Sequence, residues 1–296
     1  MIFVWIAAGL ALRRSVASAA AFARLNRFII WLPLPATILL AIHALRWDPS
    51  YWIPVSMAWF VFLAAAALFC AVGRIYGWPS RTVGALILTA GLGNTSFLGF
   101  PLLRALYGER AIPIAVLTDQ PGSFLVLSTL GLAAASYFSP QRTSFGGRML
   151  RFPPLWALIA AVLLRPFAWS WPVEAFLRLS ARTLIPLALI SVGGALNFDR
   201  TYLRRERGPL AWGLAYKLVA APAALALLFA GALHAHGEAV RITLLEAAMG
   251  PMITGAIVAV EYGLDPELCS LMVGVGVPLC LITVPLWAKI LERLGI

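Results

Sequence analysis

Residues Gly91 to Pro101 have the sequence Gly-Leu-Gly-Asn-Thr-Ser-Phe-Leu-Gly-Phe-Pro and interrupt a segment that is otherwise apolar. Three glycines and a proline do not sustain an α-helix, and the three adjacent polar side chains meet no water at the depth of a lipid bilayer. The second half of the chain holds a similar interruption, Ala-Met-Gly-Pro-Met-Ile-Thr-Gly, from Ala248 to Gly255. Paired interruptions in corresponding segments of two halves are the best sequence pointer to a transporter's binding site.

The composition indicates an integral membrane protein. Of the 296 residues, 61% are hydrophobic and 12% are charged, against roughly 25% charged in soluble domains. All spans are expected to be helical, because only helices and closed barrels cross a bilayer and no alternation of period two is present. The net charge of +11 lies in short connectors between apolar runs. This pattern is typical of topology signals rather than of a nucleic-acid-binding face, so no nucleic-acid partner is expected.

Apolar runs and their Arg, Pro and Gly boundaries predict ten transmembrane helices. The first run is followed, not preceded, by Arg13 and Arg14, which favours a retained helix over a secretory signal. The expected spans are 1–13, 25–45, 51–73, 80–106, 111–138, 152–170, 181–197, 208–233, 238–262 and 266–289.

Ten spans divide into two five-helix repeats, 1–138 and 152–296, joined by a short polar connector, 139–151. An odd number of helices per half makes the second repeat inverted. Aligning Tyr107 with Tyr262 gives a shift of 155 residues, which also aligns Ser96 with Pro251. Gly250 and Pro251 suit an N-cap and a first helical residue, and Asn94, Thr95 and Ser96 are N-cap residue types, so a second helix is expected to begin at each break.

The distribution of Lys and Arg predicts the orientation. With the connector 139–151 in the cytoplasm, thirteen basic residues lie on the inner side and nine on the outer side, while Lys217 falls inside a span. This bias places both termini outside.

Two acids fall within predicted spans. Asp119 and Gln120 precede Pro121 and Gly122, a pair that loosens the helix beside them. A carboxylate at that depth faces a cavity, is paired or is protonated; we favour a cavity, and a protonated acid that caps a packed kink is the alternative. Glu246, five residues before Pro251, is the corresponding acid in the second half, either at the site or near enough to a helix end to be wetted.

Lys217, in the eighth span, has two open interpretations. Near the midplane it serves as counter-ion for an anionic substrate or for one of the acids, and near the inner end it extends to the interface without a specific role. No phosphate-binding loop, nucleophile with a neighbouring base, or metal-ligand spacing is present, and the three cysteines lie apart in apolar segments. We therefore expect neither an enzyme nor a cofactor, and a secondary transporter or a channel remains.

The segment Gly93–Pro101, followed by Tyr107-Gly108, Asp119-Gln120 and Thr129-Leu130-Gly131, resembles the auxin efflux carrier family, whose bacterial members include predicted malate and malonate permeases. Weaker similarity continues through the sixth, seventh and ninth spans. The chain differs from the plant carriers in lacking their Asn-Pro-Asn at the first crossing and their long central loop. The resemblance therefore does not imply that auxin itself is the natural substrate.

The resemblance implies that spans 4 and 9 are broken and cross at the substrate site. It implies a scaffold of spans 1, 2, 6 and 7, a transport domain of spans 3–5 and 8–10, an elevator mechanism, a homodimer and a bacterial inner membrane location. The related bile acid transporter fold shares the crossing and often uses sodium.

Together these observations predict a transporter that holds an organic anion between two half-helix N-termini. The candidate substrate-binding residues are Asn94, Thr95, Ser96, Gly250, Pro251 and Thr254. The candidate coupling or gating residues are Asp119, Gln120, Glu246 and Lys217, and the candidate kink residues are Pro101 and Pro121. The coupling ion is H⁺ at Asp119 or, in a bile-acid-type symporter, Na⁺ on oxygen ligands of the crossing; a channel is a further alternative.

Overall fold

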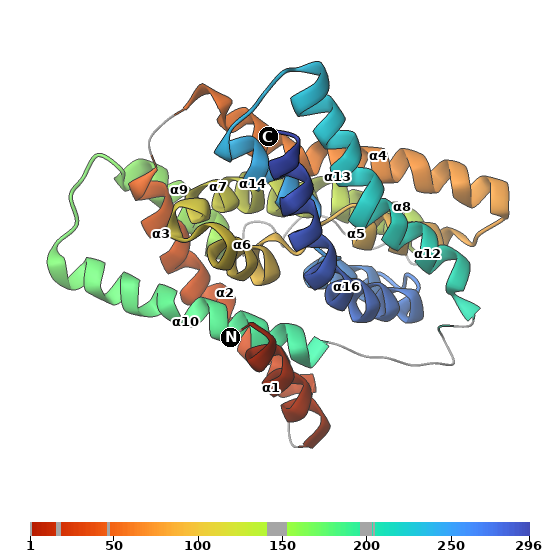
Figure 1. The fold of residues 1–296 in the computed structure, drawn as a ribbon. Coiled ribbons are helices and arrows are strands. Elements are labelled where there is room, and N and C mark those ends of the chain that lie inside the picture. Colours follow the sequence, from red (N-terminus) through yellow and green to blue (C-terminus); the bar gives the residue numbers. More distant parts are fainter. Residues whose placement is uncertain (1, 16–18, 46–47, 141–152, 196–202, 204) are drawn as a thin grey trace. The chain divides into compact units, whose positions relative to one another are not determined.

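The computed structural model describes residues 2–15, 19–45, 48–140, 153–195, 203 and 205–296 (Figure 1). Every regular element in these ranges is a helix, and one isolated antiparallel bridge joins Gly93 to Pro251. The all-helical prediction is therefore confirmed for the described part of the chain. The predicted connector 139–151 lies outside the described residues except for its first two positions.

Within the described ranges, six helices are long and apolar enough to cross a membrane. They correspond to the second, third, fifth, seventh, eighth and tenth predicted spans. Their bounds are Ala20–Ala44, Pro49–Tyr76, Glu109–Phe138, Trp171–Ala195, Arg207–Ala232 and Pro266–Arg293.

The other four predicted spans are built from shorter helices. The first and sixth contain α1 (Ile2–Ser15) and α9 (Pro153–Leu164). The fourth is divided into α5 (Ser80–Ala90) and α6 (Phe100–Tyr107), and the ninth into α14 (Glu238–Ala247) and α15 (Ile253–Glu261). Both predicted interruptions thus fall between helices, while the count of ten spans stays a prediction.

Several long helices change winding along their length. The fifth predicted span runs through η3 (Glu109–Ala111), α7 (Ile112–Leu117), the π-helical η4 (Thr118–Phe124) and η5 (Leu127–Gly131), and α8 (Leu132–Phe138). The eighth runs through α12 (Arg207–Ala215), π-helical η7 (Tyr216–Ala220), α13 (Ala221–Ala226) and π-helical η8 (Leu227–Ala232). Such π-helical turns are rare and concentrate at functional sites.

The predicted start of the seventh span was ten residues too late. Helix α10 begins at Trp171, not at 181. The residues before 181 include the charged Glu174 and Arg178, which interrupt the apolar pattern, but they form an ion pair at i and i+4 on the helix. Such pairs support a helix beyond its apolar section.

The described chain forms two compact units, each assembled from segments that are distant in the sequence. The first comprises the described parts of 1–49, 96–116 and 146–195. Within it, α10 packs against α1, α2 (Ala19–Trp31) and α3 (Pro33–Ala44), and α9 packs against α3 (Figure 1). Helices α1 and α10 approach closely, since a Cβ atom built on Gly193 would lie 2.0 Å from the carbonyl oxygen of Ile6. Small residues permit this backbone contact, as in many membrane helix pairs.

The second unit comprises the described parts of 50–95, 117–145 and 196–296. Its central element is α5, in which every residue from Thr82 to Ala90 is buried. Helix α5 contacts α4 (Trp52–Tyr76), α8, α12, α15 and α16 (Pro266–Arg293). The first helix break therefore begins at the end of the most enclosed helix of this unit.

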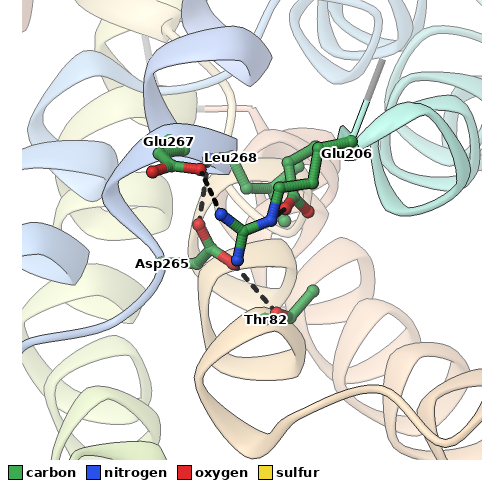
Figure 2. A network of polar contacts seen from close by, with 6 residues as sticks. Thr82, Glu206, Asp265, Glu267 and Leu268 are labelled. Carbon is green, nitrogen blue, oxygen red and sulfur yellow. Dashed lines mark hydrogen bonds and ion pairs between the residues drawn. The ribbon is translucent and has the colours of Figure 1, made fainter. Parts of the chain in front are cut away.

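A polar network fixes the starts of three helices in the second unit (Figure 2). Asp265 is the N-cap of α16, accepts a 3.1 Å hydrogen bond from the backbone N–H of Leu268, and accepts a 3.0 Å bond from the hydroxyl of Thr82 in α5. Arg205 forms ion pairs of 3.5 Å with both Glu206 and Glu267. Glu206 precedes α12 outside the apolar span, and burial, with repulsion from Asp265, raises the pKa of its carboxyl.

Candidate functional site

The two helix breaks meet within the second unit. Helix α5 ends at Ala90 and α14 ends at Ala247, and after each helix the chain continues in a non-helical conformation. The backbone N–H of Asn94 donates to the carbonyl of Gly250 at 2.8 Å, and that of Met252 donates to the carbonyl of Leu92 at 3.1 Å. In a lipid-exposed span these freed groups would have no partner. Each break therefore provides hydrogen-bond partners for backbone groups of the other break. We call the paired segments Leu92–Asn94 and Gly250–Met252 the crossing.

This pairing corrects the predicted start of the second half-helix. The N-cap of α15 is Met252 and its first residue is Ile253, so Gly250 is not the N-cap and Pro251 is not the first helical residue. Gly250 and Pro251 instead stay non-helical because they pair with the Gly93–Asn94 segment. In the first half a π-helical turn, η2 (Thr95–Gly99), begins directly after Asn94, and Pro101 lies in the first turn of α6.

Glycines allow close packing around the paired breaks. A Cβ atom built on Gly276 of α16 would lie 2.5 Å from Cδ of Pro251, and one built on Gly250 would lie 3.1 Å from Sγ of Cys280. On the other break, a Cβ atom on Gly93 would lie 3.1 Å from Nζ of Lys217. A side chain at any of these positions would have to displace its neighbour.

Asp119 is connected to the first break through a side-chain hydrogen bond. It lies in η4 and is 2% exposed. Its carboxylate accepts 2.5 Å hydrogen bonds from the hydroxyl of Thr95 and from Nε2 of Gln120. Gln120 is also buried, and Pro121 lies within the same π-helical turn. The acid and its two donors therefore form one buried cluster beside the non-helical segment.

Lys217 and Glu246 also lie near the paired breaks. Lys217 belongs to η7, is 1% exposed, and donates a 3.0 Å hydrogen bond to the carbonyl of Ala247 at the end of α14. Glu246 is 0% exposed and interacts electrostatically with Lys217 and Asp119. Lys217 does not extend to solvent and Glu246 is not exposed. A role of either residue in coupling or gating stays a prediction.

Several polar atoms of this cluster have no hydrogen-bond partner among the described residues. They are Nδ2 of Asn94, Oε1 of Gln120, and both carboxylate oxygens of Glu246. Buried polar atoms are nearly always paired, and an unpaired one requires an explanation such as a ligand, an ion or water. One donor and three acceptors left open on residues of the breaks and of the adjoining η4 indicate a site for a polar molecule or ion.

A cavity of about 330 Å³ lies within the first unit. Its polar lining comes from Thr37, Arg104, Glu109, Arg178 and Arg182, and its apolar lining includes Phe100. Arg104 pairs with Glu109 and Arg178 pairs with Glu174, whereas Arg182 has no ion-pair partner in the described part of the chain. Sequence reasoning missed this site because it counted these arginines only as topology signals.

A model of the family described as membrane transport protein matches residues 1–138 and 142–288. The chain belongs to this family. It is the auxin efflux carrier family that the motifs of the fourth and fifth spans indicated. The match covers nearly the whole chain and confirms an integral membrane transport protein, in agreement with the six long apolar helices.

Two archaeal relatives of this membrane transport protein are named as transporters. An uncharacterized transporter of Methanothermobacter thermautotrophicus is 26% identical over 277 residues, covering 90% of this chain and 88% of the relative. An uncharacterized transporter of Methanocaldococcus jannaschii is 25% identical over 281 residues, covering 90% and 89%. The family and these names indicate a transporter rather than an enzyme.

The transporter's fold brings most predicted site residues together, but not all. The crossing of the second unit contains Asn94, Thr95, Asp119, Gln120, Lys217, Glu246, Gly250 and Pro251. Ser96 is buried and follows the break directly, and Thr254 is half-buried in the first turn of α15. Among the described residues no cluster of three His, Cys, Asp or Glu side chains could hold a metal ion.

Proposed function

We propose that this chain is a secondary transporter that exports small organic anions, carboxylates such as malate, malonate or auxin-like acids, by alternating access. The observation that carries the proposal is the pair of broken helices, hydrogen-bonded to each other, with unpaired buried polar atoms beside them. In transporters, broken helices placed in this way hold substrates and coupling ions near the middle of the membrane.

The donors at the crossing suit a carboxylate. Helix α15 begins without a side-chain cap, so the N–H groups of its first turn are available to a ligand. A helix N-terminus carries roughly half a positive charge and favours an anion. The unpaired Nδ2 of Asn94 adds a donor on the opposite break. Asn94, Thr95, Ser96, Gly250, Pro251 and Thr254 are the proposed substrate-binding residues.

The arginine-lined cavity supports an anionic substrate independently. Its volume of about 330 Å³ is at the lower end of the range of small-molecule sites. Arg182 brings a guanidinium with no acidic partner in the described residues, and Phe100 brings an apolar surface. A small organic acid offers both a charge and an apolar body to such a cavity.

The proposed architecture is ten spans in two inverted repeats. A shift of 155 residues carries Trp52, the start of α4, onto Arg207, the start of α12, and carries the first break close to the second. The antiparallel direction of the Gly93–Pro251 bridge supports an inverted second repeat. We further propose an elevator movement, a homodimer, an inner membrane location and outer termini, as the family resemblance and the charge bias imply.

Transport of labelled malate, malonate and indole-3-acetate into proteoliposomes tests this function. We expect saturable uptake of at least one carboxylate, accelerated by unlabelled substrate on the opposite side. Asn94→Ala and Asp119→Asn should reduce that uptake. Conductance without counterflow would indicate a channel, and parental rates in both variants would refute the assignment of the site.

A sodium-coupled symporter is the second candidate. It is favoured by the three unpaired acceptor oxygens on Gln120 and Glu246, since carboxylate and amide oxygens are ligands for hard cations. Proton coupling through Asp119 is the first candidate. Uptake measured with choline in place of sodium, and across pH, separates the two.

A further inference from the structure

The ammonium group of Lys217 lies at the C-terminal end of a half-helix. Helix α14 ends at Ala247, whose carbonyl accepts the 3.0 Å hydrogen bond from Nζ. The last carbonyls of a helix have no donor within the helix and carry roughly half a negative charge. In transporters with broken helices, such ends and the adjoining unwound carbonyls coordinate the coupling cation. Lys217 therefore places a positive charge where a mobile cation would be expected.

The crossing has room for this ammonium because Gly93 has no side chain. The position that a Cβ atom of Gly93 would take is 3.1 Å from Nζ of Lys217 and 3.4 Å from the carbonyl oxygen of Glu246. The ammonium thus lies beside Gly93 of the first break while it donates to Ala247 at the end of α14. Even a methyl group at residue 93 would press on it.

Among the described residues, Lys217 is the cationic group that interacts with the acid nearest this end of the helix. Glu246 directly precedes Ala247, is 0% exposed, and neither of its oxygens has a hydrogen-bond partner in the described part of the chain. Lys217 interacts with it electrostatically, while Asp119 adds a second negative group nearby. An isolated carboxylate is costly within a protein in a membrane, so a cation at this place is required whenever Glu246 is ionised.

The segment that carries Lys217 is held from both sides. The hydroxyl of Tyr216 donates a 2.5 Å hydrogen bond to the carbonyl of Val61 in α4. The indole of Trp287 in α16 donates a 2.9 Å bond to the carbonyl of Leu218, which lacks a helical donor four residues on because Pro222 has no N–H. These hydrogen bonds at Tyr216 and Leu218 hold the backbone on both sides of Lys217 in place.

We propose that Lys217 is a tethered coupling cation, which occupies the cation position at the end of α14 and makes this transporter independent of sodium. The inference rests on the proposed function and selects between its two coupling modes. It predicts that removal of the ammonium leaves an anionic, oxygen-lined site that a monovalent cation can fill.

The test measures thermal unfolding of the purified protein in detergent, in NaCl and in choline chloride at equal ionic strength. The parent should melt at the same temperature in both salts. Lys217→Met, which keeps the length but loses the charge, should melt higher in NaCl by about 2 °C or more at saturating sodium. Lys289→Met, which removes the only other lysine, exposed on α16, should behave like the parent.

Transport provides a second readout. In sodium-free proteoliposomes Lys217→Met should lose uptake by about tenfold, and sodium should restore it. A residue that only caps α14 would lower stability without creating a sodium response. The double variant Lys217→Met with Glu246→Gln removes both charges, and should fold as well as the parent with no response to sodium.

The outcomes separate the inference from the proposed function. The melting experiment needs no substrate, so a failure of carboxylate transport leaves the sodium response measurable. A parent stabilised by sodium over choline, or Lys217→Met and Lys217→Gln variants that fold and ignore sodium, would overturn the proposal. If both single variants fail to fold, a double variant that also fails would overturn it, because neutralising Glu246 should remove the need for the cation.

Discussion

The hydroxyl of Thr95 and the carboxylate of Asp119 are joined by a 2.5 Å hydrogen bond inside the second unit. Thr95 opens the π-helical turn that follows the first break, and Asp119 lies in the π-helical turn of the next span. Both side chains are buried, at 0% and 2% exposure. A change in the charge of Asp119 would therefore act directly on Thr95. This residue follows the first break, which is hydrogen-bonded to the second break at Gly250.

Replacing Thr95 by Val should reduce carboxylate uptake while the protein still folds. The variant keeps the shape of the side chain but removes a donor to a charged group, a bond that contributes about 1.5–3 kcal/mol. If that loss falls on the transport step, the initial rate should fall by about tenfold or more. Thr95→Ser should keep the donor and most of the rate.

Thr89→Val is the matched control for this measurement. Thr89 is equally buried in α5, but its hydroxyl donates within the helix to the carbonyl of Ala85 at 2.6 Å. Its loss should leave uptake close to the parental rate. Equal losses in the two valine variants would show that Thr95 matters only for packing.

Sequence reasoning located the two breaks because their causes are local. Glycine, proline and clustered polar residues cannot continue an apolar helix, and these residues stand at 91–94 and 248–252. Sequence reasoning did not place the start of α15, because the non-helical conformation of Pro251 is stabilised by a bridge to Gly93, which lies far earlier in the sequence. Pairing between distant segments overrode a local capping preference.

The position of Lys217 could not be derived from its distance along the span. The eight residues from Pro209, near the start of the apolar run, to Lys217 span about 12 Å, which fits both a midplane ammonium and one that reaches the interface. The structure shows the ammonium buried and bonded to the carbonyl of Ala247, a contact with another helix that the position along one helix does not reveal. The arginine-lined cavity was not predicted because its lining comes from α3, α6 and α10, which are separate in the sequence.

Gly193→Ala should destabilise the protein through the contact between α1 and α10. Its new methyl group would lie 2.0 Å from the carbonyl oxygen of Ile6, so the two helices must separate. Overpacking of this kind costs about 1–3 kcal/mol or more. The melting temperature should fall, whereas Gly208→Ala, which meets no atom within 4 Å, should leave it unchanged or raise it. Equal melting temperatures for the two variants would argue against close α1–α10 packing.

Glu206 should make stability depend on pH. Burial and the neighbouring Asp265 raise the pKa of its carboxyl, so the folded state holds the proton to higher pH than the unfolded chain. Between the ordinary glutamate pKa and the raised folded value the folded state binds more protons, and stability falls as pH rises through that window. Glu206→Gln removes this loss, so its melting temperature relative to the parent should increase with pH and then level off.

The control for Glu206 is Glu292→Gln, which removes an exposed carboxylate at the end of α16. This variant reports the effect of losing a carboxylate that is not buried. A Glu206→Gln difference that does not change with pH would mean that the carboxyl of Glu206 has the same pKa in the folded and unfolded states.

Arg182→Gln should weaken the capture of anionic substrate by the cavity of the first unit. Arg182 lines this cavity without an acidic partner in the described residues and lies within electrostatic range of Arg104, so the arriving anion reduces an existing repulsion. We expect KM to rise by roughly three- to tenfold with little change in maximal rate, because a charge in a cavity lining acts mainly on the association of the anion. The difference should shrink at high salt, where exposed charges are screened.

The control is Arg178→Gln, whose guanidinium is already paired with Glu174 and which should change KM less. Equal effects of the two variants, or an effect on maximal rate alone, would remove Arg182 from the path of the substrate.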